Sequence, residues 1–248
     1  MAEDWCSYFC KVNDVLASIF LNLELRKAAP DRNKPNLLWV WVYVKSPRED
    51  GLSSRSEFKM LCAIEDQLTK IMTHKFDAVF CGRITTDGRR EFYYYAPRSE
   101  QLEAAVEDTI NQSRGYEFDC GWKPDPNWTQ YIEVLYPSEE DRQRIQNRKV
   151  LDVLEQKGET LQRPRDVWHW IYFRETDREE FRAAVTALQY RVESSPGHNN
   201  SEFPNGICIV RFQSVKPSEL DDAVIELFRL AKKHCGDYDG WETQAISQ

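Results

Sequence analysis

The hydrophobic pattern of this chain alternates between strand and helix periods in a set order, and that order limits the folds open to it. In the second half, residues 166–173 form a strand-like run, followed by apolar residues at helical spacing. Two more strands, a helix from Pro217 and a last strand from Tyr238 complete the order βαββαβ. This order is typical of a ferredoxin-like sandwich.

The first half shows the same order of elements without a repeat of the letters. Thr86-Asp87-Gly88 marks a hairpin, and Ser54-Arg55-Ser56-Glu57 predicts a capping box at the first helix. The sequence therefore predicts an α+β protein of two ferredoxin-like domains, the first with an extra N-terminal β-hairpin. Strands are expected at residues 37–45, 77–85, 89–95 and 116–122, and those of the extra hairpin at 5–12 and 16–23.

The length of the chain fits two domains of ordinary size. Its 248 residues are 41% hydrophobic, which is enough to build two cores. We expect the first domain over residues 1–136 and the second over 161–248. Residues 137–160 are expected to form a helical connector, because a polar helix pattern follows Ser138.

The charge of the chain bears on its partners. The net charge is −8 and both halves are acidic, which disfavours binding to nucleic acid or to an anionic membrane. A basic protein segment would be favoured electrostatically. The longest apolar run, residues 37–44, is too short to cross a bilayer, and the N-terminus lacks a signal-peptide pattern. We therefore expect a cytoplasmic protein.

Motifs of catalysis and cofactor binding are missing from the sequence. It contains no phosphate-binding loop, dinucleotide-binding glycine pattern, zinc-protease helix or serine-hydrolase elbow. The seven cysteines are scattered without a C-x-x-C pair, which favours reduced thiols in the core over a zinc site. We expect no catalytic residue, no metal and no cofactor.

The predicted topology brings the last strand beside the first strand of the second domain. In the order 4-1-3-2 these strands pair antiparallel, so residues 238–242 are expected beside 167–171. Strand alternation then turns three aromatics towards the uncovered face of the sheet. The partner on that face is the N-terminal domain, a second protein or a second copy of the chain, and the residues leave these alternatives open. The candidate interaction surface comprises Trp168, His169, Trp170, Tyr172, Asp237, Tyr238, Asp239, Trp241 and Glu242.

His169 supports a second hypothesis. It could pair with Asp237 or Asp239 across the strands, which would raise its pKa and resemble half a catalytic site. A structural hydrogen bond is the simpler interpretation, because no nucleophile is recognisable nearby. The alternative function is therefore small-molecule binding or hydrolysis in a pocket around His169 and the carboxylates of the last strand.

RNA binding is a third hypothesis, because RNA-recognition domains share the βαββαβ order. Their third strand carries stacking aromatics within a basic, glycine-containing pattern. Residues 89–95 come closest to it, with Arg89 followed by Phe92 and three tyrosines, but they lack the glycines. Packing in the sheet explains these tyrosines more simply.

Two stretches of the chain resemble known bacterial families. Residues from about 152 to 243 resemble the regulator of ribonuclease E activity B family, through Arg165 to Phe173 and the ending Tyr238-Asp239-Gly240-Trp241-Glu242-Thr243. Residues from about 4 to 137 resemble domain of unknown function 695, through residues 47–52 and 82–93.

The first resemblance implies a function, and the second implies none. The resemblance to the regulator family implies a ferredoxin-like regulatory domain that binds ribonuclease E and inhibits it without catalysis. The scaffold region of this nuclease is rich in basic segments. The chain departs from stand-alone members by its additional first domain and by Trp168-His169-Trp170. The leading hypothesis is therefore a non-catalytic protein that binds another protein.

Overall fold

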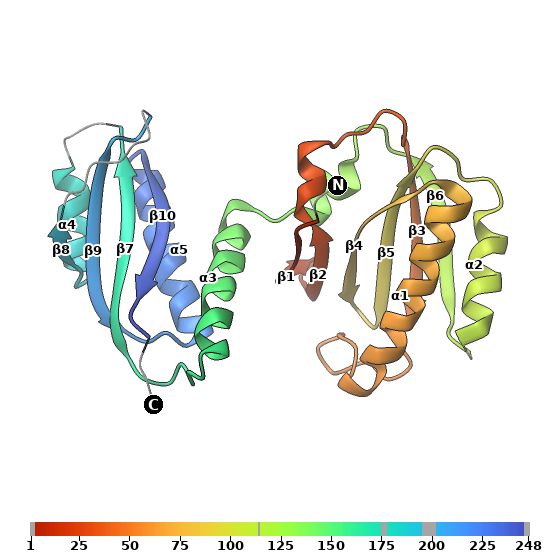
Figure 1. The fold of residues 1–248 in the computed structure, drawn as a ribbon, viewed down its shortest axis with the longest axis horizontal. Helices are drawn as coiled ribbons and strands as arrows, with labels where there is room; N and C mark the ends of the chain where they lie inside the picture. The colour runs from red at the N-terminus through yellow and green to blue at the C-terminus, as the bar shows by residue number, and fades with distance from the viewer. Residues whose placement is uncertain (1–2, 114, 175–177, 195–201, 246–248) are drawn as a thin grey trace. The chain divides into compact units, whose positions relative to one another are not determined.

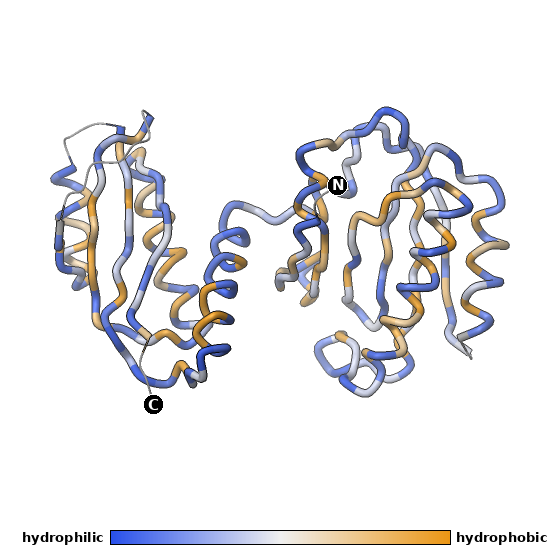
Figure 2. The backbone as a smooth tube through the Cα atoms, viewed as in Figure 1, coloured by the Kyte–Doolittle hydropathy of each residue, from blue (hydrophilic) through white to orange (hydrophobic). Residues whose placement is uncertain are grey.

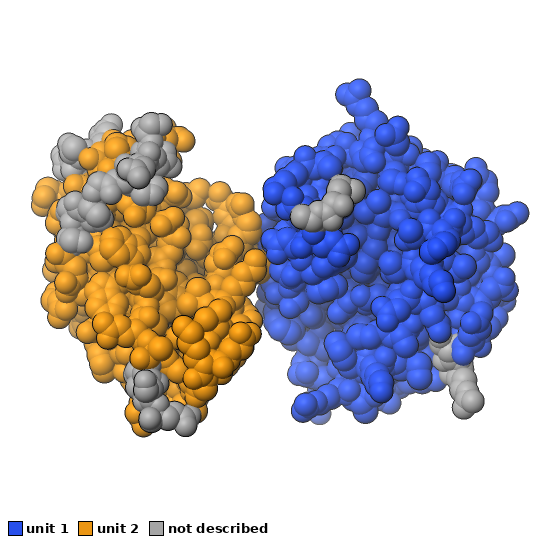
Figure 3. Space-filling view, in the orientation of Figure 1, with its two compact units in different colours: residues 1–137 blue, residues 138–248 orange. Residues whose placement is uncertain are grey.

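A computed structural model describes residues 3–113, 115–174, 178–194 and 202–245. The chain divides into two compact units, residues 1–137 (unit 1) and 138–248 (unit 2), coloured separately in Figure 3. Each unit is a mixed α+β structure with one antiparallel sheet. The α+β class predicted from the sequence is confirmed.

Unit 1 contains a six-stranded sheet in the order β1-β2-β4-β5-β3-β6. The N-terminal hairpin predicted from the sequence is present and adds two strands to the edge at β4. The strands are β1 (Trp5–Val12), β2 (Val15–Asn22), β3 (Asn36–Tyr43), β4 (Val79–Thr86), β5 (Arg89–Ala96) and β6 (Phe118–Pro124). The helical segments are η1 (Leu23–Lys27), α1 (Arg55–Phe76), α2 (Leu102–Ile110), η2 (Asn111–Ser113) and the π-helical turn η3 (Gln130–Leu135).

The helices α1 and α2 cover one face of this sheet (Figure 1). Apolar and polar residues alternate along α1 (Figure 2), and its buried apolar residues Leu61, Ile64, Leu68, Met72 and Phe76 pack on the strands. Leu38, Val40 and Val42 of β3 meet Leu61 and Leu68 of α1 in a fully buried cluster. Burying side chains of this kind stabilises the fold by roughly 1.5–3 kcal/mol each.

The segment after β6 covers part of the opposite face of this sheet. The ring of Trp128 stacks on Tyr95 at 4.2 Å, and the Tyr131 hydroxyl donates to the Asn22 carbonyl at 2.8 Å. The Tyr8 hydroxyl donates to the Leu135 carbonyl at 2.9 Å. Residues far apart in the sequence are thereby held together on this second face.

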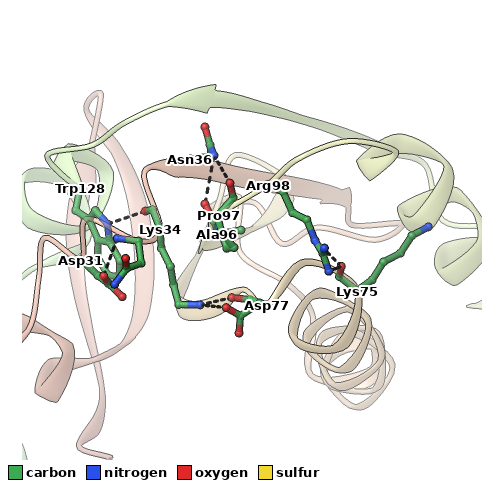
Figure 4. Close-up of polar contacts among 10 residues, drawn as sticks. Asp31, Lys34, Asn36, Lys75, Asp77, Ala96, Pro97, Arg98 and Trp128 are labelled. Carbon is green, nitrogen blue, oxygen red and sulfur yellow. Dashed lines mark hydrogen bonds and ion pairs between the residues drawn. The ribbon is translucent and has the colours of Figure 1, made fainter.

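Polar contacts at one end of the sheet connect its loops (Figure 4). The Trp128 indole N–H donates to the Lys34 carbonyl at 3.0 Å, and the Lys34 ammonium pairs with Asp77 at 2.8 Å. The Arg98 guanidinium donates to the Lys75 carbonyl, which belongs to the last turn of α1. Such contacts satisfy backbone oxygens that a helix end leaves without partners.

Unit 2 contains a four-stranded sheet in the order β10-β7-β9-β8. The helices α4 and α5 pack on one face of it, and Leu151 and Leu154 of α3 join the same core. Its elements are α3 (Glu139–Gln156), β7 (Arg165–Phe173), α4 (Glu179–Ala187), β8 (Arg191–Ser194), β9 (Asn205–Gln213), α5 (Pro217–Lys233) and β10 (Gly236–Thr243).

Two local expectations differ from the structure. The helix α3, in the segment expected to connect the domains, lies in unit 2, where the Asn147 amide donates to Asp221 of α5 at 2.7 Å. The capping box at Ser54 is wrong, because the Ser54 side chain makes no cap hydrogen bond. The Glu57 carboxylate instead accepts the backbone N–H groups of Lys45 and Ser46. Residues 196–200, whose sequence Pro-Gly-His-Asn-Asn predicts a turn, lie outside the described residues.

Candidate functional site

The pairing of β7 with β10 is the framework of the candidate surface. Trp241 lies opposite His169, and Glu242 lies opposite Trp168, in antiparallel register. The last strand of unit 2 therefore pairs with its first strand, as the sequence predicts. The helices of unit 2 pack on one face of these strands, and within the described residues no helix of this unit packs on the other face.

A β-bulge at Asp239 changes which side chains of β10 share a face. Tyr238 pairs with Ile171 and Gly240 pairs with Trp170, so Asp239 is the additional residue. Tyr238 and Trp241 consequently both face the helices. The Trp241 indole N–H donates to the Asn147 side-chain oxygen of α3 at 2.7 Å. Glycine suits position 240, because its φ of +148° is one that other residues rarely adopt.

His169 is part of the core of unit 2. It has no exposed surface, and its Nδ1 shares a hydrogen bond of 2.8 Å with the Tyr238 hydroxyl. Burial lowers the pKa of His169 to about 3, with a smaller contribution from the charge of Arg211. Its Nε2 has no hydrogen-bond partner among the described residues. The imidazole is therefore neutral at physiological pH.

The expected pairing of His169 with Asp237 or Asp239, and the raised pKa that it would cause, are wrong. Both aspartates are exposed, whereas the imidazole points into the helix-covered core. A hydrolytic or small-molecule site centred on His169 has no opening to solvent. Tyr238 is equally buried, so neither residue belongs to the interaction surface that the sequence predicted.

We call the face of β7 and β10 that lies opposite the helices of unit 2 the open face. Except for Trp241, the other residues of the predicted surface lie on it. Trp168 and Trp170 are half-buried there, and Tyr172 is buried beside them. A depression of about 380 Å³ is lined by Trp170, Tyr172, Asp239, Gly240, Trp241 and Glu242. Burial and then the charge of Asp239 raise the pKa of Tyr172.

The three carboxylates of β10 are exposed. Among the described residues, Asp237, Asp239 and Glu242 form no hydrogen bond or ion pair through their side chains. On the other side of β7, Phe212 of β9 pairs with Asp166 and is 68% exposed. Phe212 was not among the residues predicted for this surface, although strand parity places it on the same face as Val210, which lies opposite Trp168. The surface combines an aromatic centre with an acidic edge.

The residues that the structure describes contain neither a metal site nor a membrane-spanning helix. They contain no group of three or more His, Cys, Asp or Glu residues placed to hold a metal ion. No helix in the described ranges has the length and apolar character to span a membrane. None of the seven cysteines lies in a disulfide, and Cys235 is exposed rather than in the core.

Comparison with protein families identifies the first unit. The model of a family of unknown function, DUF695, matches residues 3–136, which is more than half of the chain and nearly all of unit 1. The chain belongs to the DUF695 family. The model described as regulator of ribonuclease activity B matches residues 144–243, which include most of α3 and the whole sheet of unit 2. Both resemblances inferred from the sequence are confirmed.

Other comparisons add little. A search of curated proteins gave no match. Among solved structures, the crystal structure of an unknown protein from Galdieria sulphuraria matches with 7% identity, over 86% of this chain and 99% of that one. Its TM-score of 0.22 is too low to support an argument about fold. The functional argument therefore rests on the regulator family and on the geometry of unit 2.

Proposed function

We propose that this member of the DUF695 family is a non-catalytic, cytoplasmic regulator that binds another protein through the open face of β7 and β10. The match of residues 144–243 to regulators of ribonuclease activity supports this proposal and makes ribonuclease E the first partner to test. The strand order β10-β7-β9-β8 supports a ferredoxin-like sandwich as the scaffold.

The single observation that carries the proposal is the arrangement of Trp168 and Trp170 beside the exposed carboxylates of β10. Tryptophan and tyrosine are enriched among the residues that dominate binding energy at interfaces. The neighbouring Asp239 and Glu242 are exposed and can attract a basic segment over a distance of about one Debye length. A flexible basic chain meets both requirements, because it brings cations and apolar side-chain stems together.

RNA binding receives no support from the stretch that suggested it. Tyr93 and Tyr95 of β5 are buried, and their hydroxyls donate to Glu91 and Asp125 at 2.5 Å. Arg89 is paired with Glu91 at 2.6 Å. These aromatic rings cannot stack on bases, and the cation beside them is already neutralised.

The test is calorimetric titration of the full chain with the basic C-terminal region of ribonuclease E at rising salt concentrations. We expect micromolar or tighter binding that weakens as salt rises, and a loss of at least tenfold in the double variant Trp168→Ala/Trp170→Ala. Trp122→Ala is the matched control, because Trp122 lies on β6 of unit 1 and is 52% exposed. Absence of salt-sensitive binding, or equal losses in both variants, would contradict the proposal.

A further inference from the structure

The first strands of the two sheet motifs carry the same aromatic pattern. β3 contains Trp39-Val40-Trp41-Val42-Tyr43, and β7 contains Trp168-His169-Trp170-Ile171-Tyr172. Each strand lies between the third and the last strand of its βαββαβ series, β5 and β6 in unit 1 and β9 and β10 in unit 2. In both strands the aromatic residues face away from the helices. The two units therefore share residue types at these positions, in addition to the order of their elements.

The last strands carry similar residues, offset by two positions against this pattern. β6 contains Asp119-Cys120-Gly121-Trp122, and β10 contains the shorter Asp239-Gly240-Trp241. Gly121 lies opposite Trp39, and Gly240 lies opposite Trp170. Each unit also places an aspartate beside the tyrosine. The Tyr43 hydroxyl donates to Asp119 at 2.6 Å, and the charge of Asp239 helps to raise the pKa of Tyr172.

In unit 1 a cation of the chain itself lies on the aromatic pattern. The Arg89 guanidinium lies over the Trp41 ring at 4.7 Å and donates to Glu91 at 2.6 Å and to Asp87 at 3.1 Å. Burial lowers the pKa of Arg89, but the hydrogen bonds and charges of Glu91 and Asp87 outweigh it and raise the pKa. Arg89 is therefore charged and stacked on the ring.

The described residues of unit 2 contain no corresponding cation. Arg89 lies opposite Tyr43 on β5, and the residue opposite Tyr172 on β9 is Gly206, which has no side chain. Within the described residues, no arginine or lysine lies over the rings of Trp168 or Trp170. A Cβ added at Gly240 would meet nothing within 4 Å, whereas one at Gly121 would come within 2.6 Å of the Trp39 ring. The space over Gly240, beside Trp170, is thus open, whereas the Trp39 ring itself covers Gly121.

We propose that the open face of unit 2 binds an arginine side chain of its partner, with the guanidinium stacked on Trp170 and paired with Asp239 and Glu242. Arg89 on Trp41 is the intramolecular equivalent of this contact. The inference rests on the proposed function and names the chemistry of the partner. Arginine is favoured over lysine, because a planar guanidinium stacks on an indole and binds carboxylates at the same time.

The experiment compares three versions of one short glycine-rich peptide, carrying arginine, lysine or citrulline at the same positions. Citrulline keeps the shape of arginine and removes its charge. By calorimetry with the full chain, we expect the arginine peptide to bind most tightly, the lysine peptide several-fold more weakly and the citrulline peptide at least tenfold more weakly. Trp170→Ala is expected to remove the arginine preference, and Trp122→Ala to keep it.

A second variant tests the comparison between the units. Arg89→Ala removes the guanidinium from Trp41 and leaves Glu91 in place, so we expect the number of arginine peptides bound per chain to rise from one to two. Circular dichroism checks that this variant is folded. If it is unfolded, two results still test the inference: the arginine preference of the wild-type chain, and the loss of that preference in Trp170→Ala.

Equal affinity for arginine and citrulline peptides, or an arginine preference that survives Trp170→Ala, would overturn the inference. The outcomes also separate it from the proposed function. If the nuclease segment binds in a Trp170-dependent way while the peptides show no arginine preference, only the inference fails. If the arginine peptide binds as expected and the nuclease segment does not, only the proposed partner fails.

Discussion

In each unit, one face of the sheet lies opposite the helices. These two faces carry the same aromatic strand pattern but differ in what packs on them. In unit 1, the segment after β6 packs Trp128 and Tyr131 on this face, and Arg89 lies on Trp41. In unit 2, Trp168 and Trp170 stay half-buried and the carboxylates of β10 stay unpaired within the described residues. Trp39 and Trp41 are half-buried like Trp168 and Trp170, so the two faces differ in the cation and the covering segment that unit 1 adds to the shared pattern.

The segment between the two βαββαβ series explains this difference. Its first part, η3, packs on the second face of the sheet of unit 1. Its second part, α3, packs beside α5 on the face of unit 2 that α4 and α5 already cover. The strands alone do not determine whether such a face is covered, because the covering residues come from outside the repeated series.

The largest expected effect is on the stability of unit 1. Trp128→Ala removes a buried ring that stacks on Tyr95, and should lower the free energy of unfolding of this unit by about 3–5 kcal/mol. Trp170→Ala, at a half-buried position, should cost only about 1 kcal/mol. Urea unfolding of the two variants measures both values. Equal losses would break the distinction between a packed face and an open one.

The next effect is a pH dependence of unit 2 caused by His169. Its pKa is about 3 in the folded chain and near 6.5 when unfolded, so below pH 6.5 the unfolded state binds a proton that the folded state does not. The free energy of unfolding should therefore fall as the pH falls from 6.5 towards 3, by up to about 1.4 kcal/mol per pH unit. Urea unfolding at several pH values measures this slope.

Two variants isolate the contribution of His169. His169→Gln removes the titrating group and should flatten the slope. Tyr238→Phe removes the hydrogen bond to Nδ1 but keeps the imidazole buried, and should leave the slope in place. An unchanged slope in His169→Gln would show that other groups cause it.

A smaller effect tests whether α3 belongs to unit 2. Asn147 is buried and joins the Trp241 indole of β10 to Asp221 of α5. Asn147→Ala leaves buried polar groups without partners and should destabilise unit 2 by about 1–3 kcal/mol. The neighbouring Gln146→Ala, at an exposed position, is the control for changes in helix propensity. If Asn147→Ala is as stable as this control, α3 acts as a connector instead.

The sequence predicts the elements well, because hydrophobic periods reflect burial directly. The pairing of β10 with β7 and the outward direction of Trp168, Trp170 and Tyr172 follow from strand order and alternation. The position of Trp241 does not follow, since a one-residue bulge at Asp239 reverses the alternation. The one local signal of the bulge is Gly240, because an isolated glycine within a strand often marks one, but it does not give the position of the additional residue.

The contacts of single polar residues were harder to predict. His169 hydrogen-bonds to Tyr238 rather than to an aspartate, and Glu57 accepts amides from another segment rather than from its own helix end. Both depend on tertiary neighbours. The repeated aromatic pattern was visible in the sequence, but the extra residue in β6 hides the match between the last strands.

The most direct test labels the tryptophans of the full chain with 5-fluorotryptophan and follows their fluorine NMR signals as the basic segment of ribonuclease E is added. Single substitutions to phenylalanine assign the signals. We predict that the signals of Trp168 and Trp170 shift with the fraction bound, while those of Trp39 and Trp41 stay in place. Shifts confined to Trp39 and Trp41, or binding without a shift at Trp168 and Trp170, would contradict the account.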